Sequence, residues 1–235
     1  MVEALSLVWY SIKDFWDDFV LLVMMNMLWA LAAALPLAAV WLLGARLPIL
    51  ALGLAVLLLL PLPIVTGGLF FVANQITRGV AVGWGTFVTG VKRYWLKSLV
   101  VALVNVVVLF LIGVNIQFYA TVLEGGMVGF ISVIWLAVGV YWLLVQAFWF
   151  PMILELENEK MGLALRNALL MAVVTPGFSL TLLLVAVILV VLSAVLTLPL
   201  LAFTTALLAL MANHATRSRL AYARKEPYRP GPPQS

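Results

Sequence analysis

Amide side chains inside the long apolar stretches are the first candidates for a functional site in this sequence. Asn26, Asn105 and Gln146 each lie five to seven residues from one end of such a stretch. If the stretches are helices, all three lie about 7–11 Å below the same membrane surface. Amides at one depth can bind a neutral polar solute, or they can join helices by hydrogen bonds of about 0.6 kcal/mol each. We predict such a polar layer, with interhelical bonding as the favoured role and a solute site as the alternative.

Helix-breaking residues inside apolar stretches are the second candidate. Pro61, Pro63, Gly67 and Gly68 interrupt one stretch, and Pro176 lies at the start of another. Inside a bilayer, backbone groups freed by a break must be satisfied by protein or water, so we expect the first set to pack inside the helix bundle. Transporters often bind solutes at discontinuous helices. The alternative is that the breaks only kink helices to fit a tight bundle.

Groups for enzymatic chemistry are scarce. The chain has no cysteine and one histidine, His214, and the predicted membrane segments contain no Asp, Glu, Lys or Arg. Proton relays and ion-coupled carriers normally need ionisable groups within the membrane. The carboxylates of Asp14, Asp17 and Asp18 could hold a cation, but a solvated helix face is the favoured interpretation. A solvated loop is the favoured interpretation of the acidic stretch 155–159. We predict a protein that is not an enzyme, with no catalytic residue and no metal or cofactor site.

The composition places these residues in a membrane protein. Of 235 residues, 66% are hydrophobic and 9% are charged, and the mean hydropathy is +1.21. Soluble domains carry about 25% charged residues, so this chain has too few to cover a water-facing surface. We predict an all-α, polytopic integral membrane protein whose main partner is the lipid bilayer. The net charge of +4 is explained by membrane topology, so we expect no binding to nucleic acid.

Apolar runs of about 20 residues, the length that crosses a bilayer, divide the chain into about six transmembrane helices with amphipathic segments between them. We expect membrane spans at 19–43, 47–74, 99–120, 128–150, 178–197 and 199–216. We expect interfacial helices at 1–18 and 83–98, a half-buried helix at 163–174, and a basic, Pro-rich cytoplasmic tail at 217–235.

The distribution of cations predicts the orientation. With six spans, twelve of the thirteen Lys and Arg residues fall on one side, and only Arg46 falls on the other. Cytoplasmic loops carry the excess of Lys and Arg. We therefore expect a multi-pass membrane protein with both termini in the cytoplasm.

Several short motifs resemble a known family. They are NMLWALAAALP, PIVTGG followed by ITRG, FVTGVKRYW, NIQFYA, FPMILELE and LALRNALLMAVVTPGFSLTLLL. Their order and spacing, over roughly residues 20 to 215, resemble the YesL-like family of bacterial inner-membrane proteins of unknown function. The resemblance implies an association with carbohydrate uptake and carries over no functional residue.

Two functions remain open from the sequence. The first is a transport-associated protein, either an accessory to a sugar importer or a small permease for neutral solutes. The second is a non-catalytic structural subunit that packs against a larger membrane complex through the Trp-rich span, which carries Trp135, Trp142 and Trp149. A polar cavity at the depth of the three amides favours the first function, and a dry core with an apolar outer face favours the second.

Overall fold

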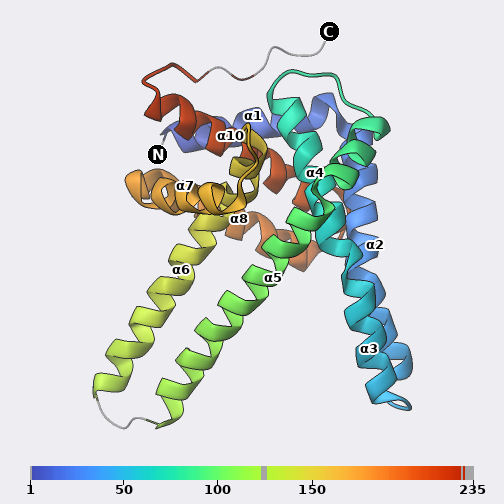
Figure 1. Cartoon of the computed structure of the whole chain (residues 1–235). Helices are drawn as coiled ribbons and strands as arrows, with labels where there is room; N and C mark the ends of the chain where they lie inside the picture. Colours follow the sequence, from blue (N-terminus) through green and yellow to red (C-terminus); the bar gives the residue numbers. More distant parts are fainter. Residues whose placement is uncertain (1, 123–125, 229, 231–235) are drawn as a thin grey trace.

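The computed structural model of this protein describes residues 2–122, 126–228 and 230. This part of the chain is all-helical, at 88% helix with no strand, and Figure 1 shows its arrangement. The helices are α1 (Val2–Asp17), α2 (Phe19–Leu43), α3 (Pro48–Leu59), α4 (Pro61–Thr77), α5 (Trp84–Val122), α6 (Gly126–Glu155), α7 (Met161–Val174), α8 (Pro176–Leu196), α9 (Leu198–Ala202) and α10 (Thr204–Ala223).

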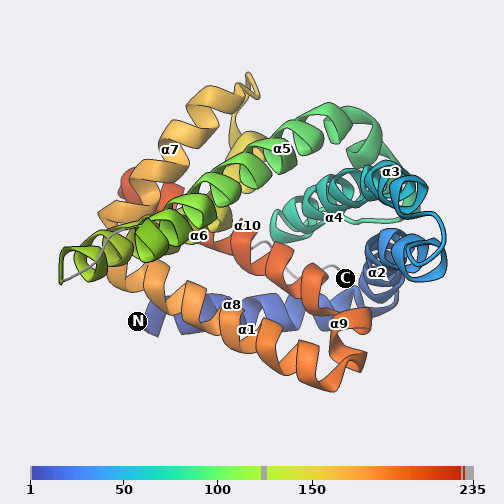
Figure 2. The same cartoon turned by 90° about the horizontal axis from the view of Figure 1, so that it is seen from below.

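The helices form a body with two arms. Helices α1, α4, α7, α8 and α10, with the adjoining ends of α5 and α6, make up the body. The α2–α3 hairpin forms one arm, and the C-terminal half of α5 with the N-terminal half of α6 forms the other. Both arms extend from the same side of the body and diverge from each other, as Figures 1 and 2 show from two directions.

The apolar surface of the arms confirms a membrane protein. Five helical segments of the described chain are long and apolar enough to cross a bilayer: Phe19–Leu43, Pro48–Thr77, Trp84–Tyr119, Ile131–Glu155 and Pro176–Leu196. Trp41 and Ile49, near the tip of the α2–α3 arm, are 83% and 87% exposed. Apolar exposure on this scale is unfavourable in water, so lipid or another membrane protein must cover the arms.

Helix α5 corrects the prediction of a separate surface helix at 83–98. The basic, aromatic segment and the following apolar span form one continuous helix of 39 residues. Such a helix is about 58 Å long, roughly twice the thickness of the hydrocarbon core. The segment contains no proline, and two of its cations, Arg93 and Lys97, pair with Glu159 as described below, so nothing makes the chain turn at Ser98.

The prolines and glycines interrupt the helices less than predicted. Only Leu60 separates α3 from α4, and Pro61 occupies the first position of α4, where its missing N–H would have had no helical partner. Pro63 and both glycines lie inside α4. The fourth span does not end at Pro151, because α6 continues through it to Glu155. Pro176 does mark a break, since it opens α8 after Thr175.

The predicted sixth span at 199–216 is two helices, α9 and α10, separated at Phe203. Helix α10 is not among the five apolar segments and is largely buried in the body. The cause is its sequence, ANHATRSR, which places polar groups on several faces of the helix. Residues 217–223, predicted as the start of a tail, are the last turns of α10.

The first and last helices, α1 and α10, pack against each other in the body. Helix α1 packs along α10 through its buried face, formed by Ala4, Leu7, Ser11 and Phe15. After α10 the chain returns to the body at Tyr228, and the end of the predicted tail, at residues 229 and 231–235, lies outside the described residues.

Candidate functional site

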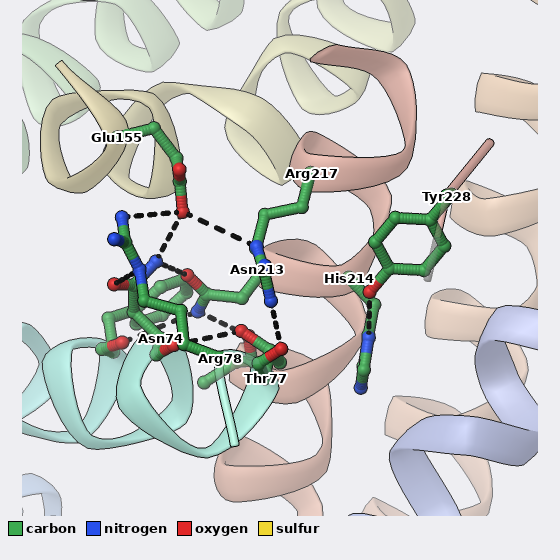
Figure 3. A network of polar contacts seen from close by, with 10 residues as sticks. Asn74, Thr77, Arg78, Glu155, Asn213, His214, Arg217 and Tyr228 are labelled. Carbon is green, nitrogen blue, oxygen red and sulfur yellow. Dashed lines mark hydrogen bonds and ion pairs between the residues drawn. The ribbon is translucent and has the colours of Figure 1, made fainter. Parts of the chain in front are cut away.

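A cluster of polar side chains joins α4, α6 and α10 inside the body, and Figure 3 shows it. We call it the polar junction; its central residues are Asn74 of α4, Glu155 of α6 and Asn213 of α10. The amide nitrogen of Asn74 donates to Glu155 Oε1 at 2.8 Å and to Asn213 Oδ1 at 3.1 Å. Asn213 donates in turn to the carbonyls of Phe70 at 3.3 Å and Ala209 at 2.8 Å. Three helices distant in sequence therefore meet through two buried amides and one carboxylate.

Two arginines neutralise the carboxylate of the polar junction. Arg78 Nη2 lies 3.1 Å from Glu155 Oε1, and Arg78 Nε donates to Asn74 Oδ1 at 3.0 Å. Arg217 Nε lies 3.9 Å from the same carboxylate oxygen, and Arg217 also donates to the carbonyl of Thr77 at the end of α4. Figure 3 shows Glu155 between the two guanidinium groups. A carboxylate this shielded needs such partners, because an unpaired buried charge is strongly unfavourable.

His214 forms a second buried contact one residue further along α10. Its side chain is fully buried; Nε2 lies 2.8 Å from Asp14 Oδ2 of α1, and Nδ1 lies 2.5 Å from the hydroxyl of Tyr228. Burial raises the pKa of Tyr228 well above its usual range, so this hydroxyl stays protonated near neutral pH. His214 of α10 therefore connects α1 with the C-terminal segment at Tyr228.

Glu159, in the loop between α6 and α7, holds the basic half of α5. It accepts a hydrogen bond from Tyr94 at 2.9 Å, pairs with Arg93 at 2.5 Å and also contacts Lys97. Burial opposes ionisation of Glu159, but the hydrogen bonds from Lys97, Tyr94 and Arg93 outweigh it and lower the pKa below 4.5. These contacts fix the N-terminal half of α5 against the α6–α7 loop. This half contains the segment 83–98, which was predicted to lie on the membrane surface.

The three predicted amides do not form one layer. Asn26 is fully buried and bonds to α9 and α10. Asn105, on α5, accepts a hydrogen bond from Trp142 Nε1 at 3.0 Å. Gln146 donates to the carbonyl of Trp142 in its own helix at 3.3 Å. Asn105 and Gln146 thus lie around the same tryptophan between α5 and α6, whereas Asn26 has separate partners.

Asn26 takes the place of a backbone hydrogen bond at the break between α9 and α10. In a continuous helix, Thr205 N–H would donate to the carbonyl of Leu201. Here Asn26 Nδ2 donates to the carbonyls of Leu201 at 2.7 Å and Leu200 at 2.9 Å. Thr205 N–H and Ala206 N–H donate to Asn26 Oδ1 at 2.9 and 3.1 Å. One amide therefore satisfies the backbone groups that the break leaves open, as the interior of a membrane requires.

The glycines of α4 mark close helix contacts. A Cβ at Gly67 would lie 1.9 Å from Ser98 Oγ, and one at Gly68 would lie 2.6 Å from Val91 Cγ2. Both neighbours belong to α5, so the two glycines allow α4 and α5 to approach closely. Thr66, the residue before them, accepts a hydrogen bond from Trp29 Nε1 at 3.0 Å and donates to the carbonyl of Leu62 at 2.8 Å. The residues predicted to line a solute path are thus engaged in packing and hydrogen bonding.

The polar junction is suited to holding helices together. Each of its amides, its carboxylate and its guanidinium groups has a protein partner. Nowhere in the described chain do three or more His, Cys, Asp or Glu side chains converge as a metal site would need. Sequence reasoning missed this junction because Asn74 and Glu155 fall at the ends of predicted segments, where polar residues are expected. The pair Asn213-His214 inside a mostly apolar helix was the available signal.

Comparisons with protein-family models, with characterised proteins and with solved structures gave no match for this chain. The resemblance to the YesL-like family therefore remains an expectation from the sequence motifs.

Proposed function

We propose that this chain is a non-catalytic accessory subunit of a larger membrane complex, with its arms as the part that meets the partner. The observation that carries the proposal is the contrast between body and arms. The polar junction and the contacts of His214 and Glu159 join helices of the body, while the arms diverge and leave their apolar surface to other molecules. In the most apolar 18-residue stretch of Pro48–Thr77, only 6% is buried within the chain. The corresponding share in Trp84–Tyr119 is 11%.

The structure favours this role over a small permease. Gly67 and Gly68 pack against α5 without room for a methyl group, and Asn26 uses its amide to join the break between α9 and α10. A solute path needs polar groups that are free to bind the solute. Of the tryptophans predicted to face a partner, Trp142 and Trp149 are buried between helices, and Trp135 is half-buried.

The partner that we propose is a membrane subunit of a carbohydrate importer. This identity rests on the family resemblance, which links such proteins to carbohydrate uptake. The exposed apolar side chains along α3 and the C-terminal half of α5 provide the surface for it.

We further propose that the body faces the bacterial cytoplasm and that four segments cross the membrane. The body holds Arg78, Arg93, Lys97 and Arg217, whereas Arg46 is the cation at the tip of the α2–α3 arm, and cytoplasmic ends carry the excess of cations. The crossing segments are α2, α3–α4, α5 and α6.

Helices α8, α9 and α10 would then form a re-entrant element. Asn26 bonds to the backbone at the break near Phe203. It lies about 10 Å from the N-terminal end of α2, whereas the C-terminal end of α2, at the tip of the arm, lies about 36 Å from that end. Figure 1 likewise shows α8 and α9 ending well above the tips of both arms. The chain therefore enters at the body side and returns to it, which places both termini on the cytoplasmic side.

Site-specific photo-crosslinking in cells tests the accessory role. A photoreactive amino acid at Leu57 of α3 or Phe110 of α5, both exposed, should give a discrete adduct with the membrane subunit of a carbohydrate importer. The same group at Trp9, which is exposed on the body, is the matched control and should give no such adduct. Adducts with lipid alone from both arm positions would contradict the accessory role, and adducts with a different membrane protein would contradict the link to carbohydrate uptake.

A further inference from the structure

A groove between α7 and α10 carries a buried cation whose hydrogen-bonding capacity is not fully used. The groove has a volume of about 340 Å³ and is lined by Asn167, Leu170, Met171, Val174, Thr175, Arg219, Leu220, Tyr222 and Ala223. Most of these side chains are apolar. Leu170, Val174 and Tyr222 are exposed, so the groove opens onto the surface of the protein, while Arg219 is 5% exposed.

Unpartnered polar atoms gather at this end of the body. Five buried side-chain polar atoms of the described chain have no hydrogen-bond partner, and four of them belong to Arg219, Thr175, Ser179 and Thr216. All four residues lie where the end of α7, the start of α8 and α10 meet. Buried polar atoms are almost always paired in native proteins. Two of these residues, Arg219 and Thr175, also line the groove, which indicates a ligand there that supplies their missing partners.

The contacts of Arg219 leave its Nε for that ligand. Nη2 donates to Glu3 and, at 3.1 Å, to Ser218 Oγ, and the guanidinium carbon lies 3.9 Å from the ring centroid of Phe178. These contacts fix the plane of the group, while Nε has no partner. Thr175 is the N-cap residue of α8 and makes no capping hydrogen bond with its side chain, so its hydroxyl is also available beside the positive end of a helix dipole.

These observations together define a site for an amphiphile with an anionic head. An acceptor-only oxyanion such as phosphate matches the N–H of Arg219, the hydroxyl of Thr175 and the start of α8. The apolar walls from Leu170, Met171 and Leu220 suit an acyl chain. We infer that the groove between α7 and α10 binds the phosphate headgroup of an acidic phospholipid. Basic pockets on the cytoplasmic side of membrane proteins bind such headgroups, but this assignment does not depend on the accessory role.

Lipid binding to the purified full chain tests the site. In nanodiscs of mixed phosphatidylglycerol and phosphatidylcholine, native mass spectrometry should show phosphatidylglycerol retained in preference. Thr175→Val, which keeps the shape of the side chain, and Arg219→Lys, which keeps the charge but lacks Nε, should each weaken this preference by about tenfold, the loss expected for a charge-assisted hydrogen bond. Arg46→Gln removes a cation at the opposite end and should leave the preference unchanged.

The other outcomes decide between the remaining explanations. Equal retention of both lipids, wild-type preference in both groove variants, or an equal loss in Arg46→Gln would overturn the assignment. Displacement of the bound lipid signal by millimolar inorganic phosphate, with no preference among lipids, would show a site for the free ion instead. If Arg219→Lys unfolds, Met171→Trp provides a second variant, because the larger side chain fills the groove and should abolish the preference without removing a polar contact.

Discussion

The amide of Asn26 replaces a backbone hydrogen bond between α9 and α10, so its removal leaves several buried groups unpaired. Two carbonyls and two N–H groups depend on it. We expect Asn26→Ala to lower the free energy of unfolding by about 3 kcal/mol, since each unsatisfied buried group costs about 1–3 kcal/mol and the break can partly relax. Thermal unfolding in detergent measures the change.

Gln146→Ala is the matched control for this prediction. Its side chain donates to a carbonyl of its own helix, so the loss should be close to the average of about 0.6 kcal/mol for polar contacts in membrane proteins. Equal effects of the two substitutions would contradict the role that we assign to Asn26.

Glu159 gives the body a pH dependence. Its pKa in the folded protein is below 4.5, so its ionised form stabilises the fold above the pKa of the unfolded chain. That contribution is lost as the pH falls through the lower, folded-state pKa. We expect wild type to unfold at a higher temperature than Glu159→Gln at pH 7, with the difference shrinking at acidic pH and lost once the pH has fallen through the lower, folded-state pKa of Glu159. A difference that persisted or grew at acidic pH would contradict the prediction.

At the scale of helices, the contact between α4 and α5 depends on glycine. A Cβ at Gly68 would lie 2.6 Å from Val91 Cγ2 and 2.8 Å from Phe87 Cε2. We expect Gly68→Ala to destabilise the protein by about 1–3 kcal/mol, the usual cost of overpacking. Gly53→Ala in α3 is the control. A Cβ added at Gly53 would meet no atom within 4 Å beyond the neighbouring backbone of its own helix, so alanine should stabilise that helix by up to about 1 kcal/mol. A neutral Gly68→Ala would show that the two helices can separate.

The sequence predicted which segments are helical better than it predicted where each helix ends. The apolar runs at 19–43 and 178–197 correspond closely to α2 and α8, because length and hydropathy decide them locally. The course of α5 past Ser98 was missed, because it depends on Glu159, a residue far along the chain that pairs with its cations. The polar junction was missed for the same reason: nothing near Asn74 in the sequence indicates that Asn213 will face it.

At the scale of the whole molecule, the polar contacts that join distant helices and the exposed apolar surface are divided between the body and the arms. The polar junction, the His214 contacts and the Glu159 contacts all lie in the body, where they join helices that are distant in sequence. The arms have mostly apolar side chains and extend away from the body. This division allows the body to hold its shape while the arms meet lipid or a partner.

The re-entrant path of α8, α9 and α10 can be tested with single cysteines, since the chain contains none. Ala45→Cys, in the turn at the tip of the α2–α3 arm, should react with an impermeant maleimide added to spheroplasts. Lys225→Cys, after α10, should react only after the membrane is permeabilised. Leu198→Cys should react in neither case, because the turn between α8 and α9 ends inside the membrane. A six-span protein would instead place Leu198 beside Ala45 on the outer surface, so labelling of both from outside would replace the re-entrant element with two full crossings.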